Sequence, residues 1–389
     1  MKICACIAEY NPFHLGHLKH LDYIKTTLGA EKLIVIMSGN FTQRGEPAIL
    51  SKFKRARQAI IAGADAVIEL PTVFATANAE TFAKGAVNIL SDLGIETGLC
   101  FGVESGTKED YISLATALNN ESKEFKRALK EHLDKGVSLA KAKFLAVKET
   151  GFEFDENLLS SPNNILGVEY TKAILDKNAS IEIFPMLRTG NHNDATFKKG
   201  ITSASSIREV LKTGKIKKLK SALPPFVYKE LDEYPFAFEK LIMAKVLLTP
   251  AEEMAKLPDC TEGLENRIKA LSKDNRTLSD LIEKVSTKRY TMARVRRILI
   301  SNLLGITDDL VKDALKSPLY AKVLAVNSNS KDVISVLAEN SKIPIITRKS
   351  DANALKRTAQ KCYEIDTIAS DVYNLMTNGK ENENQTLFV

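Results

Sequence analysis

The chain has 389 residues, of which 44% are hydrophobic, and a formal net charge of +7. This length exceeds what one hydrophobic core usually supports, so we expect two or three domains. No apolar run approaches the roughly 20 residues that span a membrane, and no charged segment with a cleavage site opens the sequence, so we expect a cytoplasmic protein with no membrane partner. Five scattered cysteines without C-x-x-C spacing indicate reduced, buried thiols.

The N-terminal half alternates between short apolar runs and segments with helical periodicity. The apolar runs are too continuous for a sheet with one solvated face, which indicates strands buried on both faces. Strands that alternate with helices through right-handed crossovers form a doubly wound parallel α/β sheet. Gly29, Gly63 and Gly94 follow three of the helices, where a cap favours a residue that tolerates positive φ. The predicted strands are 3–8, 33–38, 66–70, 99–103 and 181–184, and the predicted helices are 16–28, 48–62, 79–93 and 163–175.

Three of the five histidines, His14, His17 and His20, lie at the first strand-to-helix turn. Ligands of open parallel sheets bind at the carboxyl ends of the strands, where the helix N-terminus offers free N–H groups and a positive dipole to an anion. We therefore predict a nucleotide site here, with two imidazoles as donors and Gly16 allowing close approach to the backbone. A solvated helix start is the ordinary alternative. The spacing of three also permits a metal site, but no carboxylate or cysteine nearby completes a ligand set, and we assign no metal.

Other side chains are expected at the same edge of the sheet. Arg44 lies in the loop after the second strand, where a guanidinium can hold a carboxylate or phosphate; an arginine in a surface turn is the alternative. Arg188, in the segment 186–190, follows the fifth strand. Gly102 ends the fourth strand and Asn163 begins a helix, so both can line an adenosine pocket opposite the histidines.

These residues resemble a known family. His14-Leu15-Gly16-His17 is similar to the His-x-Gly-His signature of the nucleotidyltransferase superfamily, which binds ATP and exposes its α-phosphate to an attacking oxyanion. The blocks AEYNPFHLGH, SGNF, QRGEP, ELP, FG and SPNN resemble one branch, the bacterial tRNA(Met) cytidine acetate ligases. The match is strong from residue 1 to about 208 and weak beyond it. The resemblance implies a Rossmann-like ATP-binding domain, with ATP as a substrate accompanied by Mg²⁺.

The resemblance also implies roles for particular residues. The superfamily has a Ser/Thr-rich motif ending in Arg that holds the β and γ phosphates, and Ser203-Ala204-Ser205-Ser206-Ile207-Arg208 is similar to it. A capping box of Ser206 with Glu209 would explain the same residues without any function. We assign catalytic roles to His14, His17, Arg44 and Ser205. We expect ATP to be bound by Ile7, Ala8, Glu9, Tyr10, Asn11, Pro12, Phe13, His14, Leu15, Gly16, His17, Leu18, Lys19, His20, Gly102, Asn163 and Arg188.

Basic residues are concentrated in the middle of the chain. Residues 201–300 hold 20 Lys and Arg against 13 Asp and Glu, an excess equal to the net charge of the whole chain. An anionic polymer is therefore expected to bind there. Within it, 286–299 predicts an amphipathic helix that offers arginines to solvent, either for phosphate contact or merely as a solvated face. These arginines are Arg294, Arg296 and Arg297, and a second basic run holds Lys215, Lys217, Lys218 and Lys220.

We expect three units along the chain. The first, 1–220, is the catalytic domain, with a helical insertion at about 107–160 whose charges alternate in sign as on a solvated surface. The second, 221–318, is a basic helical domain suited to tRNA. The third, 319–389, reads as a small α/β subdomain or as strands added to a neighbouring sheet, and its polar final residues, 378–389, are expected to be mobile.

The resemblance implies a reaction in two steps. Acetate attacks ATP to give acetyl-adenylate and pyrophosphate, and the exocyclic amine of the wobble cytidine, position 34, of elongator tRNA(Met) then takes the acetyl group and releases AMP. The residues alone do not identify the carboxylate. They leave open a nucleotidyltransferase that adenylylates a small phosphate compound, an amino-acid adenylating synthetase, and a non-catalytic RNA-binding protein on the same scaffold.

Overall fold

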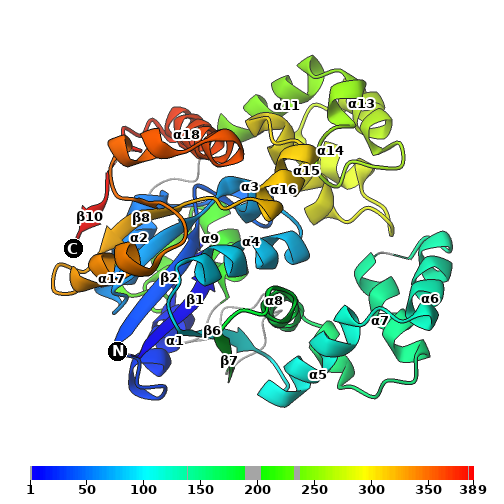
Figure 1. Cartoon of the computed structure of the whole chain (residues 1–389). Coiled ribbons are helices and arrows are strands. Elements are labelled where there is room, and N and C mark those ends of the chain that lie inside the picture. Colours follow the sequence, from blue (N-terminus) through cyan, green and yellow to red (C-terminus); the bar gives the residue numbers. More distant parts are fainter. Residues whose placement is uncertain (1, 138, 189–202, 232–236, 384) are drawn as a thin grey trace.

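A mostly parallel sheet forms the centre of the protein (Figure 1), in a computed structural model that describes residues 2–137, 139–188, 203–231, 237–383 and 385–389. The strand order is β10-β8-β5-β2-β1-β6-β7, and β9 pairs with β8. The pair of β5 with β8 is antiparallel and the others in this sheet are parallel. The strands are β1 (Ile3–Ala8), β2 (Lys32–Ser38), β5 (Ala66–Leu70), β6 (Thr97–Val103), β7 (Ile181–Leu187), β8 (Ala321–Val326), β9 (Ile345–Ile346) and β10 (Leu387–Phe388).

Helices cover both faces of the sheet, which confirms the doubly wound class. Alternate residues of β1 and β2 enter two separate apolar clusters, with Cys6 and Val35 on one face and Ala5 and Ile34 on the other. The first face packs against α1, α2 and α9, and the second against α4 and α8. Gly29, Gly63 and Gly94 have positive φ, as predicted. The helices here are α1 (Leu15–Thr26), α2 (Lys52–Ile61), α3 (Thr72–Ala75), α4 (Ala79–Asp92), α8 (Pro162–Lys177), α9 (Ala204–Lys212) and α10 (Pro225–Tyr228).

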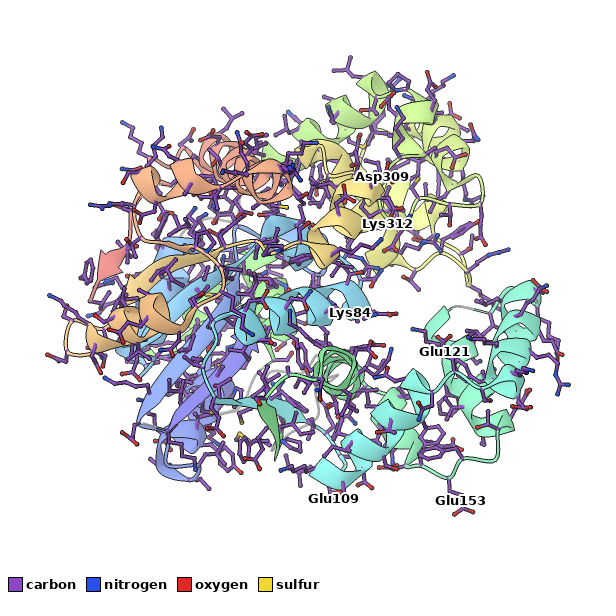
Figure 2. All side chains as sticks on the ribbon, in the orientation of Figure 1. Lys84, Glu109, Glu121, Glu153, Asp309 and Lys312 are labelled. Carbon is purple, nitrogen blue, oxygen red and sulfur yellow. The ribbon has the colours of Figure 1, made fainter. Side chains whose placement is uncertain are left out.

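The predicted helical insertion lies between β6 and β7 and projects from the sheet (Figure 1). It consists of α5 (Lys108–Asn119), α6 (Lys123–Asp134) and α7 (Leu139–Glu149). Lys143 of α7 forms a 2.8 Å ion pair with Glu80 of α4, which ties the insertion to the sheet layer. Figure 2 shows Glu121 and Glu153 on the insertion, beyond Lys84 of α4.

The middle of the chain is helical beyond residue 237, as the sequence predicts. Its helices are α11 (Ala237–Leu248), α12 (Ala251–Met254), α13 (Leu264–Asp274), α14 (Leu278–Val285), α15 (Met292–Leu304) and α16 (Asp308–Lys316). We expected a domain boundary at residue 220, but the segments before and after this residue pack in the same apolar cluster. Leu219, Leu223 and Val227 share the apolar cluster of α1 and α2, and Glu230 pairs with Arg57 at 2.5 Å. Residues 221–231 therefore belong with the sheet rather than with the helical region.

The C-terminal region is not a separate subdomain, which corrects one of the two alternatives that the sequence allowed. Its strands β8, β9 and β10 extend the central sheet, and α17 (Asp332–Asn340) and α18 (Arg357–Thr377) flank it. The final residues, which we expected to be mobile, pair with the sheet where the structure describes them. Leu387 and Phe388 pair with β8, and Val389 donates its N–H to the carbonyl of Val326 at 3.0 Å.

A buried cluster of charges fixes this last segment. Glu383 accepts hydrogen bonds from Lys52, at 2.6 Å, and from Lys322, and Glu69 pairs with the same two lysines at 2.8 and 3.3 Å. All four side chains are at most 6% exposed. Two ammonium groups thus face two carboxylates in the interior, and each would be a costly unpaired charge without the others.

All five cysteines are free and buried, as predicted. Within the described ranges, no helix combines the length and the apolar character that crossing a membrane requires.

Candidate nucleotide site

The two histidines of the motif are held in one orientation by the backbone of the turn. His14 is the N-cap of α1; its Nδ1 accepts the N–H of Gly16 at 3.0 Å, and Nδ1 of His17 accepts the N–H of His14 at 3.2 Å. The rings stack with centroids 3.7 Å apart. Because each Nδ1 is an acceptor, the proton of each neutral ring sits on Nε2. The turn therefore presents two Nε2–H donors beside the N-terminus of α1.

Aromatic packing supports this arrangement. Tyr10, buried and with φ of +49°, sets its ring edge against His17 at 4.9 Å, and the buried Phe13 lies 5.5 Å from it. The structure gives a reason for the glycine at residue 16 that the sequence did not suggest. A Cβ at residue 16 would lie 2.8 Å from Cε1 of His14, so the glycine first makes room for the histidine ring.

His20 does not join the other two histidines. Its Nε2 lies 3.3 Å from Sγ of Cys100, on β6. Burial, together with the nearby charge of Arg188, lowers the pKa of His20 to about 4, so the ring is neutral at physiological pH. In the part of the chain that the structure describes, no group of three or more His, Cys, Asp or Glu side chains is placed to hold a metal ion.

The segment 203–208 lies beside the histidine turn. Arg208 is buried; it donates from Nη1 to the carbonyl of Asn11 at 2.8 Å and from Nη2 to Oγ of Ser205 at 3.2 Å. The N-cap of α9 is Ser203, whose Oγ accepts the N–H of Ser206 at 3.2 Å. The capping box of Ser206 with Glu209 is therefore wrong, because the helix begins three residues earlier. The structure brings Ser205 and Arg208 to the histidine site.

Gly102, Arg188 and Asn163 lie around the carboxyl end of β6. The N–H of Arg188 donates to the carbonyl of Val103 at 2.8 Å, and a Cβ on Gly102 would lie 3.0 Å from Cδ of Arg188. Asn163 donates to Glu104 at 2.6 Å. Burial lowers the pKa of Arg188, while Glu104 raises it. Gly102 thus lies under the arginine side chain, and residues 189 and 190 of the same segment lie outside the described ranges.

Arg44 occupies the exposed tip of a short hairpin formed by β3 (Phe41–Thr42) and β4 (Glu46–Pro47). The N–H of Gln43 donates to Oε1 of Glu9 at 2.7 Å, so the hairpin is attached to the loop before the histidines. On its other side, Glu46 pairs with Arg296 of α15 at 2.7 Å. The site residues Ile7, Ala8, Glu9, Leu15, Leu18 and Lys19, together with the cis bond of Asn11 to Pro12, belong to this same strand, loop and helix start.

The arginines of α15 are only partly exposed, because protein groups hold them, whereas we expected them to extend into solvent. Nε of Arg294 donates to the carbonyl of Asp259 at 2.9 Å, and Arg297 pairs with the carboxylate of Asp259 at 3.6 Å. Burial lowers the pKa of Arg297, which shows how far the guanidinium is removed from water. The prediction failed because sequence periodicity shows a helix face but not what packs on it. In contrast, Lys215, Lys217, Lys218 and Lys220 are all exposed.

One buried residue of this region was missed altogether. Arg55 of α2 is 0% exposed and contacts the loops after β1 and β2. A signal was present, since residues 52, 55, 56 and 59 repeat at helical spacing and all four are buried. The helix was predicted, but the sequence analysis assigned no role to its cations.

The fold and the paired histidines define a nucleotidyltransferase, and the comparisons agree. The HIGH Nucleotidyl Transferase family matches residues 1–387. Two tRNA(Met) cytidine acetate ligases, from Acetivibrio thermocellus and Caldanaerobacter subterraneus subsp. tengcongensis, are each 38% identical to the chain over 96% of its length and over 94% and 95% of their own. The chain belongs to the HIGH nucleotidyl transferase family and, within it, to the tRNA(Met) cytidine acetate ligase family.

Two solved structures extend this similarity to the whole chain. Thermotoga maritima TmcAL in its apo form superimposes with a TM-score of 0.94 at 29% identity, and the same protein bound with alpha-thio ATP with a TM-score of 0.91 at 28% identity. Each match covers 100% of both chains.

Proposed function

We propose that this protein is an ATP-dependent ligase that activates acetate as acetyl-adenylate and transfers the acetyl group to the wobble cytidine of elongator tRNA(Met), in the cytoplasm where these substrates meet. The observation that carries the proposal is the stacked pair of His14 and His17, whose Nδ1 atoms are fixed by backbone N–H groups at the N-terminus of α1. The names of the relatives and the ATP analogue bound by the Thermotoga protein support it.

In the first step, a carboxylate oxygen of acetate attacks the α-phosphorus of ATP, and the bond from this phosphorus to the bridging oxygen breaks. Negative charge then grows on the departing pyrophosphate. Donors that are already oriented stabilise such charge without reorganising, and the two imidazoles meet this requirement. We assign the outer phosphates to Ser205 and Arg208, and the support is that Arg208 bonds to both Ser205 and the carbonyl of Asn11. We assign no protein ligand to the Mg²⁺ that accompanies ATP.

The acetate is placed by the loops that follow β1 and β2. Arg44 is the candidate for its carboxylate, because it is exposed at the tip of a hairpin that is itself fixed to Glu9 and Arg296. Contact with tRNA would serve the same exposed guanidinium equally well. In the second step, the cytidine amine attacks the acyl carbon, the mixed-anhydride C–O bond breaks, AMP leaves, and the amine loses a proton to solvent.

The tRNA surface of this proposal moves from α15 to the lysines at residues 215, 217, 218 and 220. They are exposed, and the intervening Leu219 is buried in the apolar cluster that also holds Tyr10 and Phe13. These lysines are therefore attached to the same packed layer as the histidine turn. Ammonium groups on such a surface bind phosphate backbones by releasing counterions.

The test is the release of pyrophosphate and AMP from ATP by the purified protein, with and without acetate and bulk tRNA. We expect pyrophosphate to depend on acetate, and AMP and acetylated cytidine to depend on both acetate and tRNA(Met). Pyrophosphate release driven by a phosphate compound, or by an amino acid in place of acetate, would favour a different nucleotidyltransferase. The absence of any ATP turnover in the presence of acetate and tRNA would contradict the proposal.

A further inference from the structure

The guanidinium of Arg55 is bonded to the loops on both sides of the candidate site. Nη1 donates to the carbonyl of Glu9, after β1, at 2.6 Å and to that of Ser38, at the end of β2, at 3.0 Å. Nη2 donates to the carbonyl of Gly39, and Nε donates to that of Leu50 at 2.9 Å. One planar group therefore joins the entrance of the histidine turn to both ends of the loop that contains Arg44.

The chemistry of this contact is unusual for a buried cation. Arg55 is 0% exposed, and among the described residues its hydrogen bonds all go to backbone carbonyls rather than to a carboxylate. Burial lowers its pKa to about 10, so it remains charged at neutral pH. Burying a charge without an ion partner is costly, and an apolar side chain would fill the space without that cost. The four carbonyls therefore explain why an arginine is present.

A lysine could not make the same contacts. The guanidinium holds its N–H groups in a rigid fork, whereas an ammonium is a point charge on a flexible stem. Backbone carbonyls at the carboxyl ends of two adjacent strands need donors in one plane, and the fork provides them. Two further bonds join the same loops, from the N–H of Gln43 to Glu9 at 2.7 Å and from the N–H of Ile49 to Oδ1 of Asn11 at 2.8 Å.

We propose that Arg55 is a positioning residue that sets the loop after β1, which carries ATP, against the loop after β2, which carries the attacking carboxylate. The inference rests on the proposed function, because it assumes that the two substrates lie on these two loops. A misplacement of about 1 Å between reacting groups can cost about a hundredfold in rate. The role of Arg55 is thus expected in the rate of adenylate formation rather than in the affinity for ATP.

The experiment compares wild type with Arg55→Lys and Arg55→Gln in acetate-dependent exchange of pyrophosphate into ATP and in equilibrium binding of a non-hydrolysable ATP analogue. We expect Arg55→Lys, which keeps the charge but not the fork, to lower kcat about a hundredfold while analogue binding changes by roughly threefold or less. Arg57→Lys is the matched control. It lies on the same helix with its side chain 49% exposed and paired with Glu230, so kcat should not change.

A second pair of variants avoids the interior, in case substitution of Arg55 prevents folding. Glu9→Ala removes the acceptor for the N–H of Gln43, whereas Glu9→Gln keeps an oxygen there. We expect Glu9→Ala to lower kcat, and Glu9→Gln to lower it less, because the amide oxygen still accepts the N–H of Gln43. Wild-type kcat in both Arg55→Lys and Glu9→Ala would overturn the positioning role. So would a loss of kcat matched by an equal loss of analogue binding, since that indicates a collapsed site.

The failure of the proposed function would look different. In that case the wild-type protein itself would show no acetate-dependent exchange. The outcomes that overturn the role of Arg55 all require a wild-type protein that performs the exchange.

Discussion

The histidine turn and the lysine run at residues 215–220 differ in how their polar side chains are held. The turn fixes the orientation of its rings, whereas the run exposes its ammonium groups to solvent. His14 and His17 have fixed rings, because each Nδ1 is bonded to the backbone and aromatic rings pack around them. The lysines are exposed, and it is the buried Leu219 among them that holds the segment. A group that stabilises a transition state must be oriented before the reaction, whereas a group that attracts a polyanion needs only charge and access to water. The two regions can therefore be altered separately.

The largest effect is expected from the oriented side of this comparison. His17→Ala removes one preorganised donor, and we expect adenylate formation to fall by about a hundredfold or more. The measurement is acetate-dependent exchange of pyrophosphate into ATP. Affinity for tRNA should stay at the wild-type value. Undiminished exchange in this variant would remove the nucleotidyltransferase mechanism.

Substitution of the exposed lysines should change tRNA binding and leave adenylate formation unchanged. Changing Lys215, Lys217, Lys218 and Lys220 to Glu should weaken tRNA binding and flatten the dependence of log K on log salt by about one for each lost contact. Exchange of pyrophosphate should survive. The matched control carries the same charge change on the insertion, where Lys123, Lys126, Arg127 and Lys130 are also exposed. Equal losses in the two variants would show that net charge, and not this surface, binds tRNA.

Arg44 shares one property with each region. Its side chain is exposed, as the lysines are, and its hairpin is fixed by bonds to neighbouring elements, as the histidine turn is. If it holds acetate, Arg44→Ala should raise the acetate KM about tenfold, the scale of one lost charged hydrogen bond, with tRNA affinity unchanged. Acetate saturation and tRNA binding are measured on the same preparation. A variant with weaker tRNA binding and a normal acetate KM would move Arg44 to the RNA surface, and one that changes neither would make it a surface turn residue.

The smallest expected effect is the contribution of His20 to the pH dependence of stability. Its pKa is about 4 in the folded protein against an ordinary 6.5, so between these values the unfolded chain binds more protons. The free energy of unfolding should therefore fall as the pH is lowered from about 6.5 to about 4, by at most about 1.4 kcal/mol per pH unit for one proton. Urea unfolding across this range checks it. His20→Phe should flatten that part of the curve, and an unchanged slope would show that other groups cause it.

The strands of the sheet could be predicted from the sequence because their apolar composition indicates that both of their faces are buried. Residues 33–37 are apolar at every position, a pattern typical of a strand that is buried on both faces. The place of β8 could not be found in this way. Its partner β5 lies about 255 residues earlier, and an apolar run does not state which neighbour it pairs with.

The errors in the site concern charged residues. We expected Arg294 and Arg297 to face water and overlooked Arg55, although Arg55 and Arg294 donate to backbone carbonyls and Arg297 pairs with Asp259. The residue type of a cation does not show whether its partner is a phosphate, a carboxylate or a backbone carbonyl. The histidine turn escaped this ambiguity because its residue types, its spacing and its place between strand and helix all indicated one use.

The docked segment that contains Glu383 has a consequence for the order in which the chain can fold. Lys52 lies in the second helix of the sheet layer, yet one of its two carboxylate partners is 331 residues away and is made near the end of synthesis. Before that residue is synthesised, the cluster of Lys52, Lys322 and Glu69 lacks one of its two paired carboxylates. The helix that supports Arg55 is therefore expected to reach its final stability only late, after β10 has joined the sheet. Contacts of such long sequence separation also slow folding.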